Sequence, residues 1–266
     1  MNSETTLRLA VFLGLFACFA AIEVFWPRRK GGQKRKQRWF VNWSIVLLDT
    51  VTLRLMSVIV PLLAVGAAID AQARGVGLLN STEWPAAIEF IVAILVFDLA
   101  IWFQHLLMHR VPILWRLHQV HHVDEEMDVT TAIRFHPIEI ALSMLLKIGL
   151  VYLLGPSAIA VVAFEVLLNG TALFNHANIK LPAGVDRIVR LVLVTPDMHR
   201  VHHSIHPKEH HRNFGFALSI WDKVFGTYLA QPAEPHETMP IGLSYDQQTP
   251  KTLGAALSMP FREPKP

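Results

Sequence analysis

The sequence predicts an all-α protein, a polytopic membrane helical bundle with a histidine-rich helical cap on its cytoplasmic side. Three observations predict this fold class. The chain has 266 residues, of which 52% are hydrophobic and only 17% charged, whereas a soluble domain carries about 25% charged residues. Several apolar runs are long enough to cross a bilayer as helices. The 14 histidines fall mostly in tight groups close to the ends of those runs.

The first apolar run, Leu7–Trp26, is followed by dense positive charge and is not preceded by it. Seven basic residues and no acidic residue lie between Arg28 and Arg38. A cleaved signal peptide carries its charge before the apolar stretch, so we expect an uncleaved anchor whose N-terminus lies outside. Short cytoplasmic loops collect Lys and Arg. The basic loop is therefore a topology signal, and we expect no nucleic-acid partner.

The second apolar region, Trp39–Ile69, is interrupted by Asp49, Arg54 and Pro61. Charged side chains are costly inside a spanning helix, and proline removes a backbone hydrogen bond from it. We therefore expect the first turns to lie along the membrane interface and Val51–Ile69 to make the crossing.

Three further apolar segments follow a short external loop at Gly75–Pro85. Ala86–Met108 predicts a third span that returns to the cytoplasmic side. Ile138–Leu154 and Ser157–Phe174 are joined by a Gly-Pro pair, which predicts a helical hairpin whose ends both reach that same side.

Two charged residues, Lys147 and Glu165, lie inside this hairpin at a similar distance from its turn. An unpaired charge at that depth is costly, so we hypothesise that the two side chains face each other as a pair. The alternative is that Lys147 reaches the headgroups and Glu165 faces a polar cavity near the site.

Histidines form three groups with helical spacing. They are His105 with His109, then His118 with His121 and His122, then His199 with His202 and His203. Positions i, i+3 and i+4 share one face of a helix, so each group points its imidazoles in one direction. Imidazole binds zinc, copper, iron or nickel, and eight such side chains exceed what one ion needs. Two metal ions are therefore expected, with His176 as a ninth ligand.

The single cysteine, Cys18, lies in an apolar run, so a disulfide framework and Cys-based zinc or iron–sulfur sites are excluded. The ordered HxxxH, HxxHH and HxxHH boxes resemble the fatty acid hydroxylase superfamily, which includes sterol desaturases, C-4 methylsterol oxidases and alkylglycerol monooxygenase. The resemblance is extended by Asp98 before the first box, by residues 131–137 and by residues 213–227.

This resemblance implies two Fe²⁺ ions, O₂ as co-substrate and a lipid-like substrate that enters from the bilayer. It implies electrons from a separate redox protein, since no cytochrome b5-like domain is recognised in the chain. Carried onto this sequence, the ligands are His105, His109, His118, His121, His122, His176, His199, His202 and His203.

We expect three regions. Residues 1–89 hold N-terminal spans and the basic loop, residues 90–228 form the fatty acid hydroxylase-like catalytic domain, and residues 229–266 form a Pro-rich extended tail. The protein is expected in the inner or plasma membrane, with its active site on the cytoplasmic side.

Several other polar residues are weaker site candidates. Asp98 shares a helical face with the first box and is expected either to accept a hydrogen bond from a ligand histidine or to join helices. Asp124, Asp128, Asp197 and Asp222 flank the boxes and are expected mainly as caps or surface acids. His136 is expected in the core, and His206, His210, His211 and His236 in solvent. Trp102, Phe103 and Trp115 are candidates for lining a substrate channel, and an interfacial aromatic belt or packing explains them equally well.

A membrane zinc hydrolase acting on lipids is the main alternative. Such enzymes commonly use HExxH, which is absent here, and no box contains Glu. A metal transporter would need its ligands at mid-membrane depth. The ligand set does not separate hydroxylation from desaturation or ether cleavage.

Overall fold

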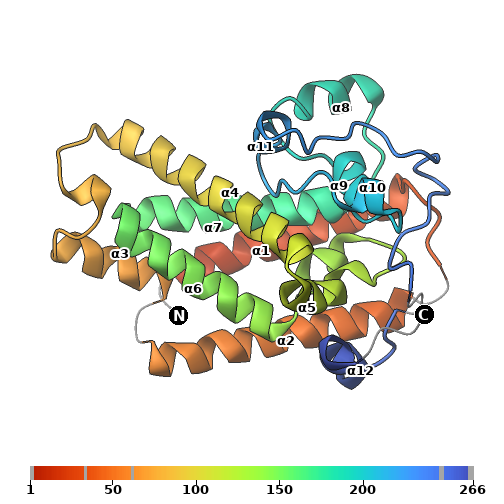
Figure 1. Cartoon of the computed structure of the whole chain (residues 1–266), viewed down its shortest axis with the longest axis horizontal. Coiled ribbons are helices and arrows are strands. Elements are labelled where there is room, and N and C mark those ends of the chain that lie inside the picture. Colours follow the sequence, from red (N-terminus) through yellow and green to blue (C-terminus); the bar gives the residue numbers. More distant parts are fainter. Residues whose placement is uncertain (1–2, 33–34, 61–62, 246–248, 263–266) are drawn as a thin grey trace.

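The computed structural model describes residues 3–32, 35–60, 63–245 and 249–262, and these contain helices and isolated β-bridges only. This confirms the all-α prediction. The long helices lie along the longest axis of the molecule (Figure 1); they are α1 Ser3–Phe25, α2 Arg35–Ile59, α4 Ala86–Arg110, α6 Pro137–Leu154 and α7 Ala158–His176.

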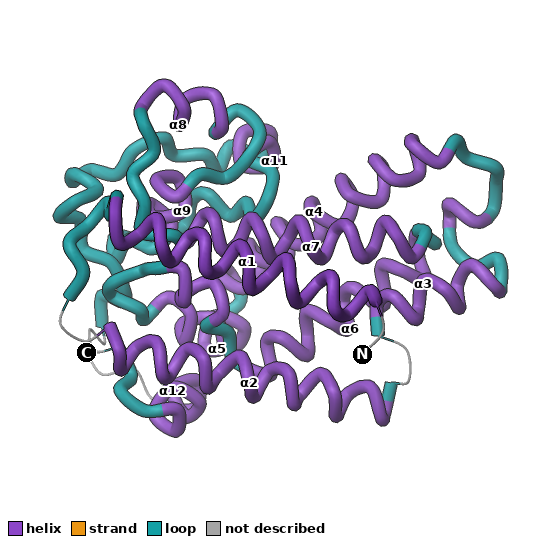
Figure 2. The backbone as a smooth tube through the Cα atoms, turned by 180° about the vertical axis from the view of Figure 1, so that it is seen from behind, coloured by secondary structure: helices purple, strands orange, loops and turns teal. Residues whose placement is uncertain are grey.

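Short elements cover both ends of this bundle (Figures 1 and 2). At one end lie α3 Ala64–Ala73 and the 3-10 turn η1 Leu78–Asn80. The cap at the other end comprises α5 Pro112–His122, η2 Val129–Ile133, α8 Ala183–Val189, α9 Pro196–His202, α10 Pro207–His210, α11 Ile220–Val224, α12 Leu253–Ser258 and η3 Met259–Phe261.

Five apolar stretches of the described chain are long enough to cross a membrane, with mean hydropathies of 1.6 to 2.3. Large apolar side chains on their outer faces are exposed, for example Leu55 on α2, Leu153 on α6 and Ile159 on α7. A soluble protein of this size would bury such surfaces. The protein is an integral membrane protein, as the composition predicts.

The second apolar region differs from the expectation. α2 is one continuous helix of 25 residues, about 37 Å long at 1.5 Å per residue, and neither Asp49 nor Arg54 interrupts it. Its first turns pack against the cap, where Arg38 pairs with Asp124 and Asp128. They are therefore continuous with the rest of α2 and do not form a separate segment. α3 is a separate helix on α6 and α7, and Pro61 lies outside the described residues.

The predicted hairpin of α6 and α7 is present. Gly155 ends α6 in the left-handed conformation, with φ of 70°, which favours glycine because it has no Cβ. A Cβ there would also lie only 2.7 Å from the Val76 carbonyl oxygen. Glu89 of α4 then accepts a hydrogen bond from the Ser157 amide, 2.6 Å away, at the start of α7.

The predicted pair inside the hairpin is confirmed, since Lys147 Nζ lies 2.8 Å from Glu165 Oε1. The structure adds a partner that the sequence analysis missed. Arg8 of α1 binds the other carboxylate oxygen of Glu165. One buried acid therefore joins α1, α6 and α7.

The C-terminal tail is only partly extended. Much of it follows the surface of the cap (Figure 1), but α12 forms within it. Leu243, Ala256 and Met259 are buried against Val120 of α5 and Ile45 of α2. Apolar side chains at these tail positions have a core to join, so the tail completes the packing between the cap and α2.

Candidate metal centre

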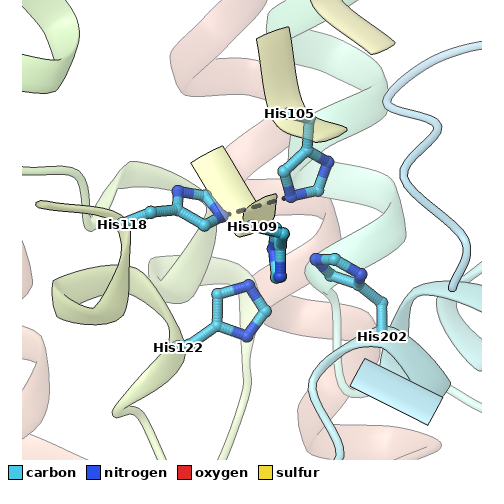
Figure 3. Close-up of side chains that lie close together, drawn as sticks. All are labelled: His105, His109, His118, His122 and His202. Atoms are coloured by element: carbon cyan, nitrogen blue, oxygen red, sulfur yellow. Dashed lines mark hydrogen bonds between the residues drawn. The ribbon is translucent and has the colours of Figure 1, made fainter. Parts of the chain in front are cut away.

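Nine buried histidines converge at the cap end of the bundle in two groups. The first group comprises His105, His109, His118, His122 and His202, whose rings face a common centre (Figure 3). The second comprises His121, His176, His199 and His203. Within each group the ligand atoms lie within 4.8 Å of one another. All nine histidines that the sequence singles out are therefore brought together, in two sets.

Local sequence explains how the rings reach this position. The first box ends α4, and Pro112 at the first turn of α5 starts a new helix that carries the second box. Thr195 caps α9 by accepting a hydrogen bond from the Met198 amide, and Pro196 occupies its first turn, as predicted. His176 is the last residue of α7.

Backbone carbonyls fix the orientation of three rings. Nδ1 of His105 lies 2.8 Å from the Phe214 oxygen, and Nδ1 of His202 lies 2.7 Å from the Arg212 oxygen. Nδ1 of His176 lies 2.8 Å from the oxygen of Ala172. A carbonyl only accepts, so each Nδ1 carries the hydrogen and the lone pair is left on Nε2.

Nε2 atoms of the clustered rings approach one another in three pairs. His105 Nε2 lies 3.1 Å from His118 Nε2 in the first group. In the second group His176 Nε2 lies 3.0 Å from Nε2 of both His121 and His199. Two nitrogens bound to one ion at about 2.1 Å and at right angles would be about 3.0 Å apart.

The remaining nitrogens also need a partner. Both ring nitrogens of His109, His122 and His203, and Nε2 of His202, are buried with no hydrogen-bond partner among the described residues. Buried polar atoms are rarely left in this way because their desolvation is costly. A cation in each group would bind one nitrogen of each of these rings, so the donor set fits two metal ions.

The protonation state of the histidines in the cap also favours metal binding. Burial lowers the pKa of His118 to about 3. Burial and neighbouring imidazoles hold the pKa values of His122 in the first group and His203 in the second well below the usual range. These rings are neutral at pH 7, which is the form that binds metal.

One carboxylate orients a ligand ring, and the sequence analysis missed it. Glu139 Oε1 lies 2.7 Å from His118 Nδ1, and Glu139 is buried. Metal-bound histidines commonly hold their second nitrogen against a carboxylate in this way. The available signal was the position of Glu139 in the first turn of a helix that His136-Pro137 starts at the site.

Asp98 does not contact a ligand histidine. Its Oδ2 accepts hydrogen bonds from Trp221 Nε1 at 2.8 Å and from the Leu218 amide at 3.2 Å. This matches the helix-joining alternative. Asp98 therefore fixes the segment before α11 against α4.

Asp222 binds the backbone at Phe214 and Gly215, so it is not merely a surface acid. It accepts hydrogen bonds from the amides of Phe214 and Gly215, each at 2.8 Å, and from Trp102 Nε1 at 3.0 Å. Because the Phe214 carbonyl binds the His105 ring, Asp222 positions that ligand through the backbone.

The other flanking acids are structural. Asp124 and Asp128 pair with Arg38, and Asp197 pairs with Arg200 and Arg28. The pair of Asp197 with Arg200 lies within the cap. The other pairs join the cap to α2 or to the loop between α1 and α2.

The expectation of solvated histidines is wrong for His210, His211 and His236, which are half-buried or buried. His210 is half-buried, with its ring 4.8 Å from His109, and burial together with the charge of His211 lowers its pKa to about 3. His236 is buried against Gln231. His206 is partly exposed beside Glu234, and His211 is half-buried beside His210. His136 is buried, as expected, and caps α6.

A cavity of about 300 Å³ leads from the first histidine group into the bundle. His105 and His118 line its cap end, and Lys147 and Glu165 line the other. Apolar side chains such as Phe12, Leu53 and Met144 line the space between them. The expected channel aromatics do not line it: Trp102 stacks on Phe225 in the cap, Phe103 is exposed, and Trp115 packs on His109 and His210.

Comparison with known proteins agrees with the motifs. An ornithine lipid hydroxylase of Rhizobium tropici is 28% identical over 253 residues, covering 94% of this chain and 74% of that protein. The alkylglycerol monooxygenase of Homo sapiens is 30% identical over 172 residues, covering 64% and 36%. Human cholesterol 25-hydroxylase is 27% identical over 140 residues, covering 52% and 50%.

This chain thus spans most of the bacterial relative but half or less of the two human ones. No solved structure gives a significant match. The family model described as fatty acid hydroxylase matches residues 90–227, which is more than half of the chain and includes all nine clustered histidines. The protein therefore belongs to the fatty acid hydroxylase family.

Proposed function

We propose that this protein is a membrane-bound non-haem diiron oxygenase that uses O₂ to oxidise a lipid drawn from the bilayer. The site faces the cytoplasm, and a separate redox protein supplies electrons. The first histidine group holds one Fe²⁺ and the second holds the other.

One observation carries the proposal: two groups of buried histidines lie in a membrane bundle, and His105 and His118 of the first group line the end of a cavity that runs into that bundle. Bound iron would supply the activation of O₂ needed to oxidise an unactivated C–H bond. Neutral imidazoles without carboxylate ligands are donors that iron accepts. The named activities of the relatives, which include two hydroxylases and a monooxygenase acting on lipids, support the same reaction class.

The chain's own residues would position the reactants and keep water away. Hydrogen bonds from ring Nδ1 atoms to the carbonyls of Phe214 and Arg212 hold two rings with Nε2 toward the centre. Phe135 stacks on His121 with centroids 4.4 Å apart and also lines the cavity. The Phe135 ring would therefore keep water that enters through the cavity away from the second group.

The cavity favours a lipid over a water-soluble substrate. Its lining is mainly apolar, and it lies among helices whose outer faces suit a bilayer. A lipid chain would reach it laterally, between the spans. Hydroxylation, desaturation and ether cleavage share the first hydrogen abstraction, so all three remain within the proposal.

Lipid mass spectrometry tests the reaction. Membranes from cells expressing the wild-type chain or the His202→Ala variant are incubated with a reductant, with and without O₂. We expect an O₂-dependent lipid product from the wild-type protein only. A product that forms equally without O₂ would instead support the zinc hydrolase and contradict the oxygenase.

A further inference from the structure

Asp49 is a buried acid inside the membrane bundle, and its Oδ1 has no hydrogen-bond partner among the described residues. Only 6% of its surface is exposed. It lines the cavity that reaches His105 and His118. An ionisable side chain within a span is costly unless it has a partner, so an incoming group that donates a hydrogen bond to Asp49 would be stabilised here.

Its position on α2 shows why its Oδ1 has no partner in the described part of the chain. One face of α2 carries Arg38, Asn42 and Ile45, and all three contact the cap. Arg38 binds Asp124, Asn42 donates to Thr130, and Ile45 packs against Val120. One turn further on, the cap has ended and Asp49 faces the cavity.

The side chains around Asp49 in this part of the cavity offer acceptors. Glu139 is close enough for the two carboxyl groups to interact electrostatically, and its Oε2 is buried without a partner. Gln104 Oε1, next to His105 on α4, is also buried without a described partner. Two cationic side chains of the cavity wall, Lys147 and Arg8, bind Glu165. An incoming hydrogen-bond donor would therefore find several free acceptors here.

We propose that Asp49, with Gln104, binds the polar head of an amphipathic lipid through its hydroxyl or ammonium donors. This inference rests on the proposed function and names its substrate class. Glu139 bonds to His118 and also interacts with Asp49, so the bound head lies beside the first histidine group. Leu53 and Met144 line the cavity one turn further from the cap. The chain extends along them, and the oxidised carbon is near the head.

Lipid binding tests this inference without turnover. The full chain in nanodiscs, kept under argon without reductant, is titrated with three probes of equal chain length: monopalmitoylglycerol, its dimethyl ether and hexadecylamine. Variants are Asp49→Leu, Asp49→Asn and, as control, Asp70→Asn. Asp70 is another acid of the apolar region, but it pairs with Arg74 and lies outside the cavity.

We expect wild-type protein and Asp70→Asn to bind one or both donor probes at least about tenfold more tightly than the dimethyl ether. Asp49→Leu removes that preference. Asp49→Asn keeps a hydrogen-bond acceptor but loses the charge, so it should still bind monopalmitoylglycerol and no longer bind hexadecylamine. This variant therefore separates a hydroxyl head from an ammonium head. It also replaces Asp49→Leu if that variant does not fold.

Equal binding of the dimethyl ether and the donor probes by wild-type protein would overturn the inference. The inference would also be overturned if both folded Asp49 variants bound the donor probes with wild-type affinity. It would equally be overturned if wild-type protein bound neither donor probe. Because no oxidation is measured, an inactive protein that shows the expected selectivity would refute the oxygenase and leave this head-group site standing.

Discussion

At the scale of residues, the site depends on which groups bind the Nδ1 hydrogens of its histidine rings. Carbonyls take the Nδ1 hydrogens of His105, His176 and His202, while Glu139 takes that of His118. The opposite nitrogens are thereby turned toward common centres. A site of this kind loses affinity when an orienting group is removed, even though every ligand remains.

Glu139→Ala should therefore weaken metal binding by about 10- to 100-fold, because the His118 ring loses its orienting acceptor. Competition with a chelator, followed by metal analysis of the protein, measures this. Glu89→Ala is the control, since Glu89 caps α7 at the opposite end of the bundle. Equal metal retention in both variants would show that Glu139 does not act on the site.

At the scale of elements, Glu165 is the point where α1, α6 and α7 are joined. Removing it leaves two cationic side chains without their acid, whereas Lys147→Met leaves the bond from Arg8. We expect Glu165→Gln to lower stability by about 3 kcal/mol and Lys147→Met by clearly less. Thermal unfolding in detergent decides this, with a double-mutant cycle for the coupling. Equal, additive losses would contradict the network.

The difference between what the sequence predicts and what the structure shows is clearest for the secondary-structure elements. Hydropathy and the Gly-Pro turn located the hairpin, and helical spacing found eight of the nine clustered histidines, because both depend on residues close in the chain. His176 was expected from its position at the end of the hairpin. The role of Glu139 depends on α5 meeting α6, and that of Asp222 on a loop meeting α4. The packing of the first turns of α2 on the cap depends on the ion pairs of Arg38 with Asp124 and Asp128. Such contacts between distant segments leave no periodic signal.

At the scale of the whole molecule, all histidine groups lie at the end of the bundle that also carries the basic loop (Figure 2). We expect cysteines at Lys30 and Lys208, which are exposed, to be labelled by an impermeant reagent from the cytoplasmic side only. A Cys18→Ser background removes the native thiol. Labelling of the two positions from opposite sides would contradict the proposed topology.

The central claim is that two sets of histidines hold two iron ions. Metal content per chain tests it most directly, measured on wild-type protein and on one variant from each set, His122→Ala and His203→Ala. The account predicts two irons in the wild-type protein and about one in each variant, because each loses a ligand from a different ion. A single zinc per wild-type chain, or two irons retained in both variants, would contradict it.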